Sequence, residues 1–130
     1  MAKDLFEMAA EFYPKAEKSS EGQKVLKHLD QVYQFRVGGK DEFYVEVKGG
    51  HLGVKKGKTA ITGMDDMTLI EADGEELKKI FLGKVRPIEV QIGQKWQFGG
   101  GDTPERTLIT MITRIAQEVV REEIIENYQG

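Results

Sequence analysis

The fold is decided by residues 31–56, which read QVYQFRVGGKDEFYVEVKGGHLGVKK. Apolar and polar residues alternate over 33–37 and again over 43–48, so the hydrophobic period in this segment is two. Such alternation is typical of strands that bury one face against a core. The segment therefore predicts two antiparallel strands.

Glycine pairs connect these strands to each other and to a third strand. A Gly-Gly pair at 38–39 opens the first connection, and a second pair at 49–50 allows a tight hairpin into a strand over 52–55. The next residues, 56–66, are rich in Gly, Thr and Asp and predict a loop. Strand character returns over 67–72, which reads MTLIEA.

Short helices are predicted before the strands. Apolar residues at helical spacing indicate a first helix over 3–18, which Pro14 should kink or end near Tyr13, because proline removes a backbone donor and clashes with the preceding turn. Ser20 and Gln23 form a capping-box pattern, so we expect a second short helix to begin there.

The middle of the chain predicts one more short helix and two more strands. Asp73, with Glu76 three residues later, marks the start of a helix that should end at Gly83. Alternating apolar residues over 88–92 and 96–98 predict two further strands.

The last predicted helix is the longest. Thr103 can cap it, and Pro104 suits the first helical position, where its missing N–H does no harm. At 1.5 Å per residue, a helix over 104–127 would be about 36 Å long. Its wide apolar stripe consists of Leu108, Met111, Ile112, Ile115, Ala116, Val119 and Ile124, with Ile109, Val120 and Ile125 on the flanks.

This order of elements predicts an α+β fold, in which helices cover one face of a mostly antiparallel sheet. Two interpretations of the apolar stripe remain open. It can fill the space above the strands completely, or it can leave a cavity between helix and sheet, with Met111 as an adaptable wall. Periodicity does not separate a filled core from a ligand cavity.

The whole chain has 130 residues, no cysteine, a net charge of -3 and a pI near 5.5. This length predicts a single domain over 1–130. The acidic balance argues against nucleic-acid binding, which usually needs a basic excess. Acidic residues at Asp4, Glu7 and Glu11 interrupt the apolar core that a signal peptide would need, and no apolar run is long enough to span a membrane. We therefore expect a cytoplasmic protein.

Patterns for catalysis and metal binding are missing from the sequence. His28 and His51 have no neighbours spaced as metal ligands, and the adjacent Asp65 and Asp66 are unsuited to converge on one bond. The Gly-rich run 99–103 lacks the Lys-Ser/Thr ending of a phosphate loop, and no serine lies in a G-x-S-x-G elbow. We expect no catalytic residue, no metal site and no cofactor, so the protein is predicted not to be an enzyme.

One stretch of this acidic chain is locally basic. Between Leu77 and Trp96, five cations accompany the single acid Glu89. Such a stretch fits an anionic headgroup or a membrane surface. It also fits an ordinary solvated surface, which the wide spacing of the charges favours. The cations are Lys78, Lys79, Lys84, Arg86 and Lys95.

The order of several motifs resembles the sterol carrier protein 2 family over about residues 20–120. Family members typically have an alternating strand pair, a D-x-T-L-like strand, a short helix ending in Gly-Lys, a proline, a turn with Gly and Lys, and Gly-Asp before the last helix. The matching residues are Phe35-Arg36-Val37, Phe43-Tyr44-Val45-Glu46-Val47, Met67-Thr68-Leu69, Asp73 to Leu77, Phe81-Leu82-Gly83-Lys84, Pro87, Gly93-Gln94-Lys95 and Gly101-Asp102. The resemblance implies a five-stranded sheet covered on one side by helices.

The resemblance also implies a ligand: a fatty acid, acyl-CoA, a phospholipid or a sterol-like molecule. We therefore predict a non-catalytic protein of lipid binding or transfer, with an acyl chain held between the sheet and the C-terminal helix. Transient contact with a membrane surface and a homodimer are compatible with this prediction. Lys84 or Lys95 would lie near the headgroup, and the expected lining is Phe81, Ile88, Trp96, Phe98, Met111, Ile112, Ile115 and Val119.

The main alternative is a protein-protein interaction or accessory domain with a filled core and no lipid ligand. Exposed Tyr44 and an uncovered sheet face would favour it. An enzyme is the third hypothesis, and it would need an acid, a base or a metal that the sequence does not show.

Overall fold

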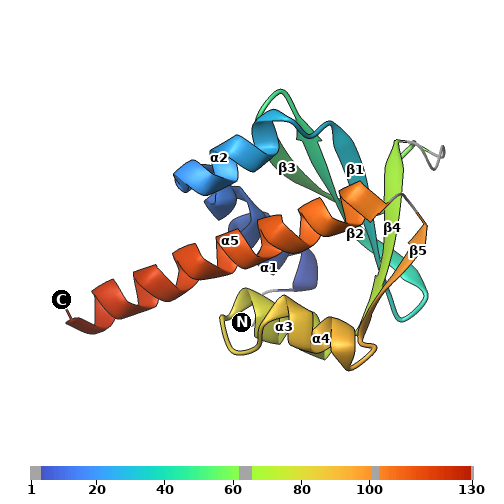
Figure 1. Ribbon diagram of the computed structural model, residues 1–130. Helices are drawn as coiled ribbons and strands as arrows, with labels where there is room; N and C mark the ends of the chain where they lie inside the picture. Colours follow the sequence, from blue (N-terminus) through green and yellow to red (C-terminus); the bar gives the residue numbers. More distant parts are fainter. Residues whose placement is uncertain (1–3, 62–65, 101–102, 130) are drawn as a thin grey trace.

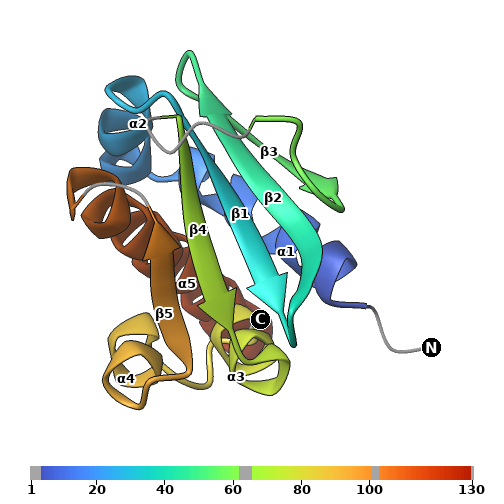
Figure 2. The ribbon, with the colours of Figure 1, turned by 90° about the vertical axis from the view of Figure 1, so that its right-hand side faces the viewer.

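The computed structural model describes residues 4–61, 66–100 and 103–129, and in these residues five strands form one sheet (Figures 1 and 2). The strand order is β3-β2-β1-β4-β5. Neighbouring strands are antiparallel except β1 and β4, which run parallel, so the sheet is mixed rather than purely antiparallel. The strands are β1 (Gln31–Val37), β2 (Lys40–Lys48), β3 (His51–Lys56), β4 (Met67–Ala72) and β5 (Trp96–Gly100).

Helices cover one face of this sheet, as Figure 1 shows from the side and Figure 2 from the opposite face, which carries no helix of the described chain. The long helix α5 crosses that face, with the N-terminal helices beside it and α3 and α4 at one end. The α+β class and the long C-terminal helix are therefore confirmed. The helices are α1 (Leu5–Phe12), the 3₁₀ helix η1 (Tyr13–Lys18), α2 (Ser20–Lys27), α3 (Gly74–Phe81), α4 (Pro87–Ile92) and α5 (Thr103–Gln129).

Strand register places the large apolar side chains in one row on the covered face. Phe43 pairs with Phe35, Phe35 with Ile70, and Ile70 with Phe98. Side chains of paired residues point to the same side of a sheet, so the alternation in the sequence becomes a continuous apolar row across β2, β1, β4 and β5. The rings of Phe35 and Phe43 are stacked, with their centroids 4.6 Å apart.

The first helix ends where the proline predicted. α1 ends at Phe12, and the chain continues as η1 with Pro14 in its first turn. The predicted start at Lys3 lies outside the described residues. The expected cap of the second helix is shifted by one residue, because Ser19, rather than Ser20, accepts a hydrogen bond from the Gly22 N–H at 3.4 Å.

The predicted start of the third helix is confirmed. The Asp73 carboxylate accepts a hydrogen bond from the Glu76 N–H at 3.1 Å, and α3 begins directly after Asp73. The backbone leaves the helix at Gly83, whose φ of +78° is readily adopted by glycine.

The strand predicted over 88–92 is wrong, because these residues form the helix α4. Pro87 occupies the first helical turn, and the Glu89 carboxylate accepts a hydrogen bond from the Arg86 N–H at 3.0 Å. Six residues are too few for periodicity to separate the two structures. In a strand, Ile88, Val90 and Ile92 would share one face, whereas in α4 only Val90 of these three is buried.

The apolar stripe of α5 is buried only over its first half. The residues that are almost completely buried are Ile109, Ile112, Ile115 and Ala116. By contrast, Ile124 and Ile125 are more than half exposed. The helix begins at Thr103, and the preceding Gly101-Asp102 of the family pattern lies outside the described residues. The sequence therefore predicted the helix correctly, but the apolar stripe of the helix extends beyond the part that is buried.

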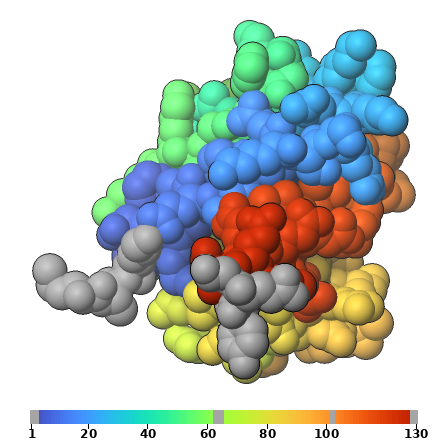
Figure 3. All heavy atoms as spheres, turned by 90° about the vertical axis from the view of Figure 1, so that its left-hand side faces the viewer, coloured from blue at the N-terminus to red at the C-terminus, as the bar shows by residue number. Residues whose placement is uncertain are grey.

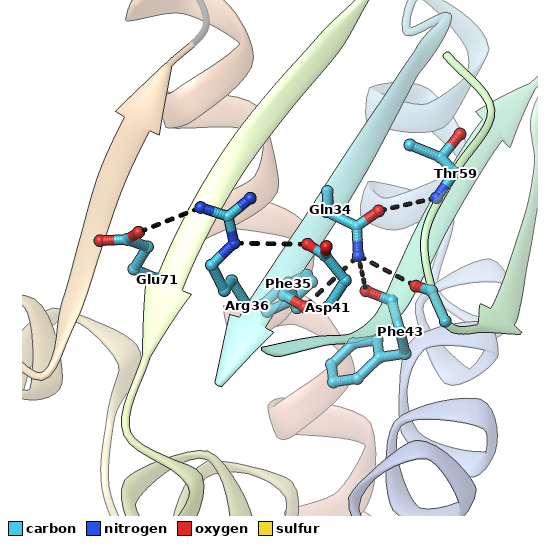
Figure 4. Close-up of polar contacts among 8 residues, drawn as sticks. Gln34, Phe35, Arg36, Asp41, Phe43, Thr59 and Glu71 are labelled. Atoms are coloured by element: carbon cyan, nitrogen blue, oxygen red, sulfur yellow. Dashed lines mark hydrogen bonds and ion pairs between the residues drawn. The ribbon is translucent and has the colours of Figure 1, made fainter. Parts of the chain in front are cut away.

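The other face of the central strand is also covered, in part by the residues that follow β3. Gln34 points to this face, where its amide nitrogen donates to the carbonyls of Phe43 and Gly57 at 3.1 and 3.0 Å. Its carbonyl oxygen accepts a hydrogen bond from the Thr59 N–H at 2.8 Å (Figure 4). Because β1 is buried on both faces here, the prediction of one buried face is incomplete.

A second polar link on this face involves Arg36, which lies between two carboxylates in Figure 4. Its guanidinium is 3.4 Å from the Asp41 carboxylate and 3.6 Å from the Glu71 carboxylate. These contacts connect β1 to both of its neighbours. All three side chains are partly exposed, so each ion pair adds little stability.

Replacement of the buried amide tests the importance of the Gln34 contacts. We expect Gln34→Leu to lower the free energy of unfolding by about 2–3 kcal/mol, because the Thr59 N–H and the Gly57 carbonyl lose their partner in a dry environment. Urea unfolding followed by circular dichroism measures the change. The exposed Gln97→Leu is the matched control and should stay within about 0.5 kcal/mol of the parent; equal effects of the two variants would contradict this account.

Candidate functional site

The space directly between the sheet and the first half of α5 is filled. Trp96 is only 2% exposed, and its ring packs edge-on against Phe35 at 5.5 Å between centroids. Ile112 and Ile115 of α5 are as deeply buried. Among the described residues, the cavity expected between these two layers is therefore replaced by packed side chains.

Tyr13 and Phe12 form a wedge between the sheet, α3 and the middle of α5. The Tyr13 ring is fully buried, 5.9 Å from Phe35 on the sheet and 5.8 Å from Phe81 on α3. Its hydroxyl lies 3.1 Å from the Thr113 hydroxyl on α5. This Phe12–Tyr13 wedge joins the sheet, α3 and α5.

Beyond the wedge, an open cleft of about 510 Å³ lies between α1, α3 and the second half of α5. Figure 3 shows these three segments meeting on the side of the molecule where α5 ends. Phe12 and Phe81 form apolar lining at its base, with ring centroids 4.8 Å apart. The remaining apolar lining residues are Met8, Leu82, Val120 and Ile124.

Charged side chains occur on the lining of the same cleft. Lys15 donates a hydrogen bond of 2.7 Å to the Glu123 carboxylate, which joins η1 to α5. Lys78 on α3 is also on the lining, and its ammonium is 3.5 Å from Glu75. An apolar base combined with a few charged groups suits an amphipathic ligand.

Lys15 also affects the ionisation of the Glu123 carboxyl on the lining. The hydrogen bond from Lys15 lowers the pKa of the Glu123 carboxyl below its usual value, and the positive charge of Lys18 adds to this effect. At neutral pH the carboxylate is therefore charged. Both partners are partly exposed, so their contact orders the lining more than it stabilises the fold.

The structure distributes the predicted lining residues over several environments. Phe81 lines the cleft, Trp96, Ile112 and Ile115 belong to the filled core, and Ile88 is exposed on α4. Phe98, Met111 and Val119 are half-buried away from the cleft. Ligand contact by these seven other residues remains a prediction.

The two lysines expected near a headgroup lie outside the cleft. Lys84 is exposed in the connection between α3 and α4. Lys95 is exposed beside a polar depression that Arg36, Glu71 and Asp73 also line. The cations on the cleft are instead Lys15 and Lys78.

The residues weighed for catalysis do not converge. His28 ends α2 and is exposed, whereas His51 lies on β3, 3.1 Å from the Glu17 carboxylate. In the described ranges, no group of three His, Asp or Glu side chains is arranged to hold a metal ion. Asp65 is outside those ranges. The helices described here also include none with the length and hydrophobicity to cross a membrane.

Neither a protein-family model nor a curated protein sequence matches this chain. Solved structures do match its fold. The sterol carrier protein domain 2 of Helicoverpa armigera superposes with a TM-score of 0.62 at 16% identity, covering 86% of each chain. This is a sterol carrier protein 2-like fold.

Two further solved structures share the sterol carrier protein 2-like fold. The ubiquinone synthesis protein UbiJ-SCP2 has a TM-score of 0.62 at 12% identity, over 86% of this chain and 94% of that one. Sterol carrier protein 2 from Yarrowia lipolytica has a TM-score of 0.56 at 17% identity, over 87% and 89% of the two chains. The family resemblance found in the sequence is therefore confirmed at the level of the fold.

The sequence analysis missed most of the cleft. Three of the lining residues, Met8, Phe12 and Lys15, come from the N-terminal helices, for which the sequence analysis predicts no ligand contact. One signal was available in the lengths of the elements. A helix of about 36 Å is longer than a strand of five to nine residues, which spans at most about 30 Å at about 3.3 Å per residue. The far end of the apolar stripe in this sterol carrier protein 2-like fold therefore had to meet another element.

Two buried tyrosines, Tyr13 of the wedge and Tyr33 of β1, allow a pH test of this packing. Burial raises the pKa of Tyr13, and burial together with the nearby Glu105 charge raises the pKa of Tyr33. The unfolded chain ionises both phenols near pH 10, but the folded protein keeps them neutral. Stability should therefore be complete below about pH 10 and fall as the pH rises further.

Urea unfolding at about pH 8 and about pH 11 measures this loss. Tyr13→Phe should reduce the alkaline loss by up to about 1.4 kcal/mol per pH unit, because one proton fewer is released on unfolding. The variant also loses the contact with Thr113, so its stability at pH 8 should fall by about 1 kcal/mol. An unfolding free energy of the parent that is equal at both pH values would contradict the buried, neutral phenols.

Proposed function

We propose that this protein binds a single-chain lipid or a similar apolar ligand in the cleft between α1, α3 and α5, and carries it without changing it chemically. The observation that supports the proposal is the open apolar cleft of about 510 Å³ in a sterol carrier protein 2-like fold. Volumes of this order are typical of small-molecule sites. The cleft also favours this function over an interaction domain with a filled core.

Burial of methylene groups would supply the binding energy. At about 0.8 kcal/mol per methylene, ten buried methylenes contribute on the order of 8 kcal/mol before the cost of lost motion. Met8 adds an adaptable wall, because its flexible thioether can repack around chains of different shape. The partial exposure of Leu82 and Ile124 gives the ligand a direct way in from solvent.

The proposal keeps three expectations from the sequence: one domain, action in a reducing cytoplasm, and no cofactor. The ligand classes that it includes are fatty acids, acyl-CoA, phospholipids and sterol-like molecules. The lining carries two cations, Lys15 and Lys78, and two carboxylates, Glu11 and Glu123, and Lys15 is paired with Glu123. Among the ligand classes we favour an acyl chain with a small anionic head, which Lys78 would meet.

Two methionines allow a matched test of where the ligand binds. Met8 lines the cleft, whereas Met111 is half-buried on α5 outside it, and both can be replaced by tryptophan. We expect Met8→Trp to fill the cleft and weaken binding of a fluorescent fatty acid about tenfold or more, with the fold retained. Met111→Trp should bind as the parent does.

Protein stripped of lipid by organic solvent and refolded is the starting material, and circular dichroism confirms that each variant is folded. Saturable binding by the parent is required. Absence of such binding would refute lipid binding altogether. Loss of binding in Met111→Trp but not in Met8→Trp would move the ligand to the sheet side of α5, as the sequence first predicted.

The lysines allow a second matched comparison, on the headgroup. We expect Lys78→Gln to weaken fatty-acid binding roughly three- to tenfold, because a charged hydrogen-bond donor to the carboxylate is lost. The corresponding fatty alcohol should bind both proteins equally. Lys84→Gln, which changes an exposed lysine outside the cleft, is the control, and an equal loss in both variants would contradict a headgroup site at Lys78.

A further inference from the structure

The helix α4 exposes two aliphatic side chains to solvent, and the first of them, Ile88, lines a pocket beside α5. Ile88 and Ile92 are 52% and 77% exposed, and their spacing of four residues puts them on one side of the helix. Leu82, at the end of α3, is 47% exposed. Half of the large apolar side chains that are exposed in the described residues thus fall within eleven residues, so we consider this segment as an interaction surface.

Unpaired cations lie beside these aliphatic residues. Lys84 and Arg86 directly precede α4, and Lys95 follows it. Within the ranges that the structure describes, the side chains of these three residues form no ion pair. The one carboxylate within the stretch, Glu89, accepts a hydrogen bond from the Arg86 N–H. From neighbouring elements, Glu118 lines the same pocket as Arg86, and Glu71 and Asp73 line the depression beside Lys95. We call Leu82, Lys84, Arg86, Ile88, Ile92 and Lys95 the α4 surface.

Hydrogen bonds to α5 hold α4 and the connection before it in place. Val90 is buried, and the Gln91 amide donates a hydrogen bond of 2.8 Å to the Thr110 hydroxyl on α5. The buried Gln117 amide donates to the carbonyls of Ile80 and Val85, at 3.0 and 2.6 Å. Both ends of the connection before α4 are thus fixed to α5, so Ile88 and Ile92 are exposed by the packing of the fold and not by fraying of the helix.

We propose that the α4 surface docks on the face of an anionic lipid bilayer, with Ile88 and Ile92 inserted among the headgroups and Lys84 and Arg86 against the lipid phosphates. A short amphipathic helix with aliphatic residues beside cations has the two features that interfacial binding uses. The cations gain from the negative surface potential, and the aliphatic side chains leave water.

A second copy of the chain fits this surface less well. In a symmetric dimer the same patch meets itself, so the cations of one copy would face those of the other. The exposed face of a six-residue helix is also small beside the roughly 800 Å² that each partner of a stable protein complex buries. Lipid phosphates offer the opposite charge and need no complementary shape.

Docking through the α4 surface would bring the cleft close to the membrane. Leu82 lines the cleft, and only the short connection 82–86 joins it to α4. The inference does not depend on the proposed function, because a surface can bind a bilayer whether or not the cleft holds a lipid. If both are correct, a ligand could pass between bilayer and cleft over a short distance.

Cosedimentation with vesicles tests the docking. The full chain is mixed with vesicles of phosphatidylcholine alone or with about 30% phosphatidylserine added. We expect binding to the anionic vesicles only, and its loss when sodium chloride is raised from about 0.1 M to about 0.5 M, because salt screens the surface charge. Equal binding to both vesicle types, or to neither, would overturn the proposal.

Two double variants separate the contributions. Ile88→Ser with Ile92→Ser should lower the partition coefficient about tenfold or more, and Lys84→Gln with Arg86→Gln should lower it roughly fivefold for each cation. All four side chains are exposed, so the fold should be unaffected. The controls are Ile125→Ser, at an equally exposed isoleucine of α5, and Lys56→Gln with Lys58→Gln, which removes two exposed charges elsewhere.

A fluorescent reporter locates the contact directly. In Ile92→Trp the new indole is exposed, while the native Trp96 stays buried and contributes a constant background. We expect the emission to shift to the blue on addition of anionic vesicles, and Ile125→Trp to show no shift. A shift in Ile125→Trp alone would place the membrane contact at the end of α5 and overturn the proposal.

Two further results would refute docking through α4. One is vesicle binding by both double variants that equals that of the parent. The other is a dimer in light scattering that the Ile88→Ser and Ile92→Ser variant abolishes, since the surface would then be an interface between copies. Fatty-acid binding in vesicle-free buffer reports on the cleft alone, so its failure and a failure of docking are distinguishable.

Discussion

The burial of Tyr13 between the sheet, α3 and α5 is the constraint on which the rest of the molecule depends. A fully buried phenol needs a partner for its hydroxyl, and Thr113 on α5 provides it. Pro14 ends α1 directly after this position, so the chain can turn while Phe12 and Tyr13 stay in the core. The wedge thereby ties the N-terminal segment to the long helix.

The wedge also explains why the molecule has a cleft at the end of α5. In its first half, α5 meets the sheet with Ile109, Ile112 and Ile115, and the layers interlock. The cleft beside the second half of α5 is lined by residues of α1, η1 and α3 and by no residue of the strands. Three helices that meet at one end do not fill the space between them, so their apolar side chains line an open site.

The central strand, the end of α1, the bounds of α3 and the long last helix could be predicted because they depend on local chemistry. Alternation in 31–48, Pro14, Asp73 and Gly83 act within a few residues of their own position. The helix α4 was missed because Pro87 to Ile92 is too short for its period to be recognised. The parallel pairing of β1 with β4 depends on contacts between residues more than thirty positions apart, which no local pattern records.

The sequence by itself determined the α+β class, the resemblance to sterol carrier protein 2 and the presence of a long apolar helix. Only the tertiary structure decided where that helix is packed and where it leaves a cleft, and which isoleucines of 88–92 remain exposed. The physical reason is that an apolar side chain is driven out of water without a preference for any particular partner. Periodicity reports that a face will be buried, whereas the identity of its partner depends on the packing of the whole chain.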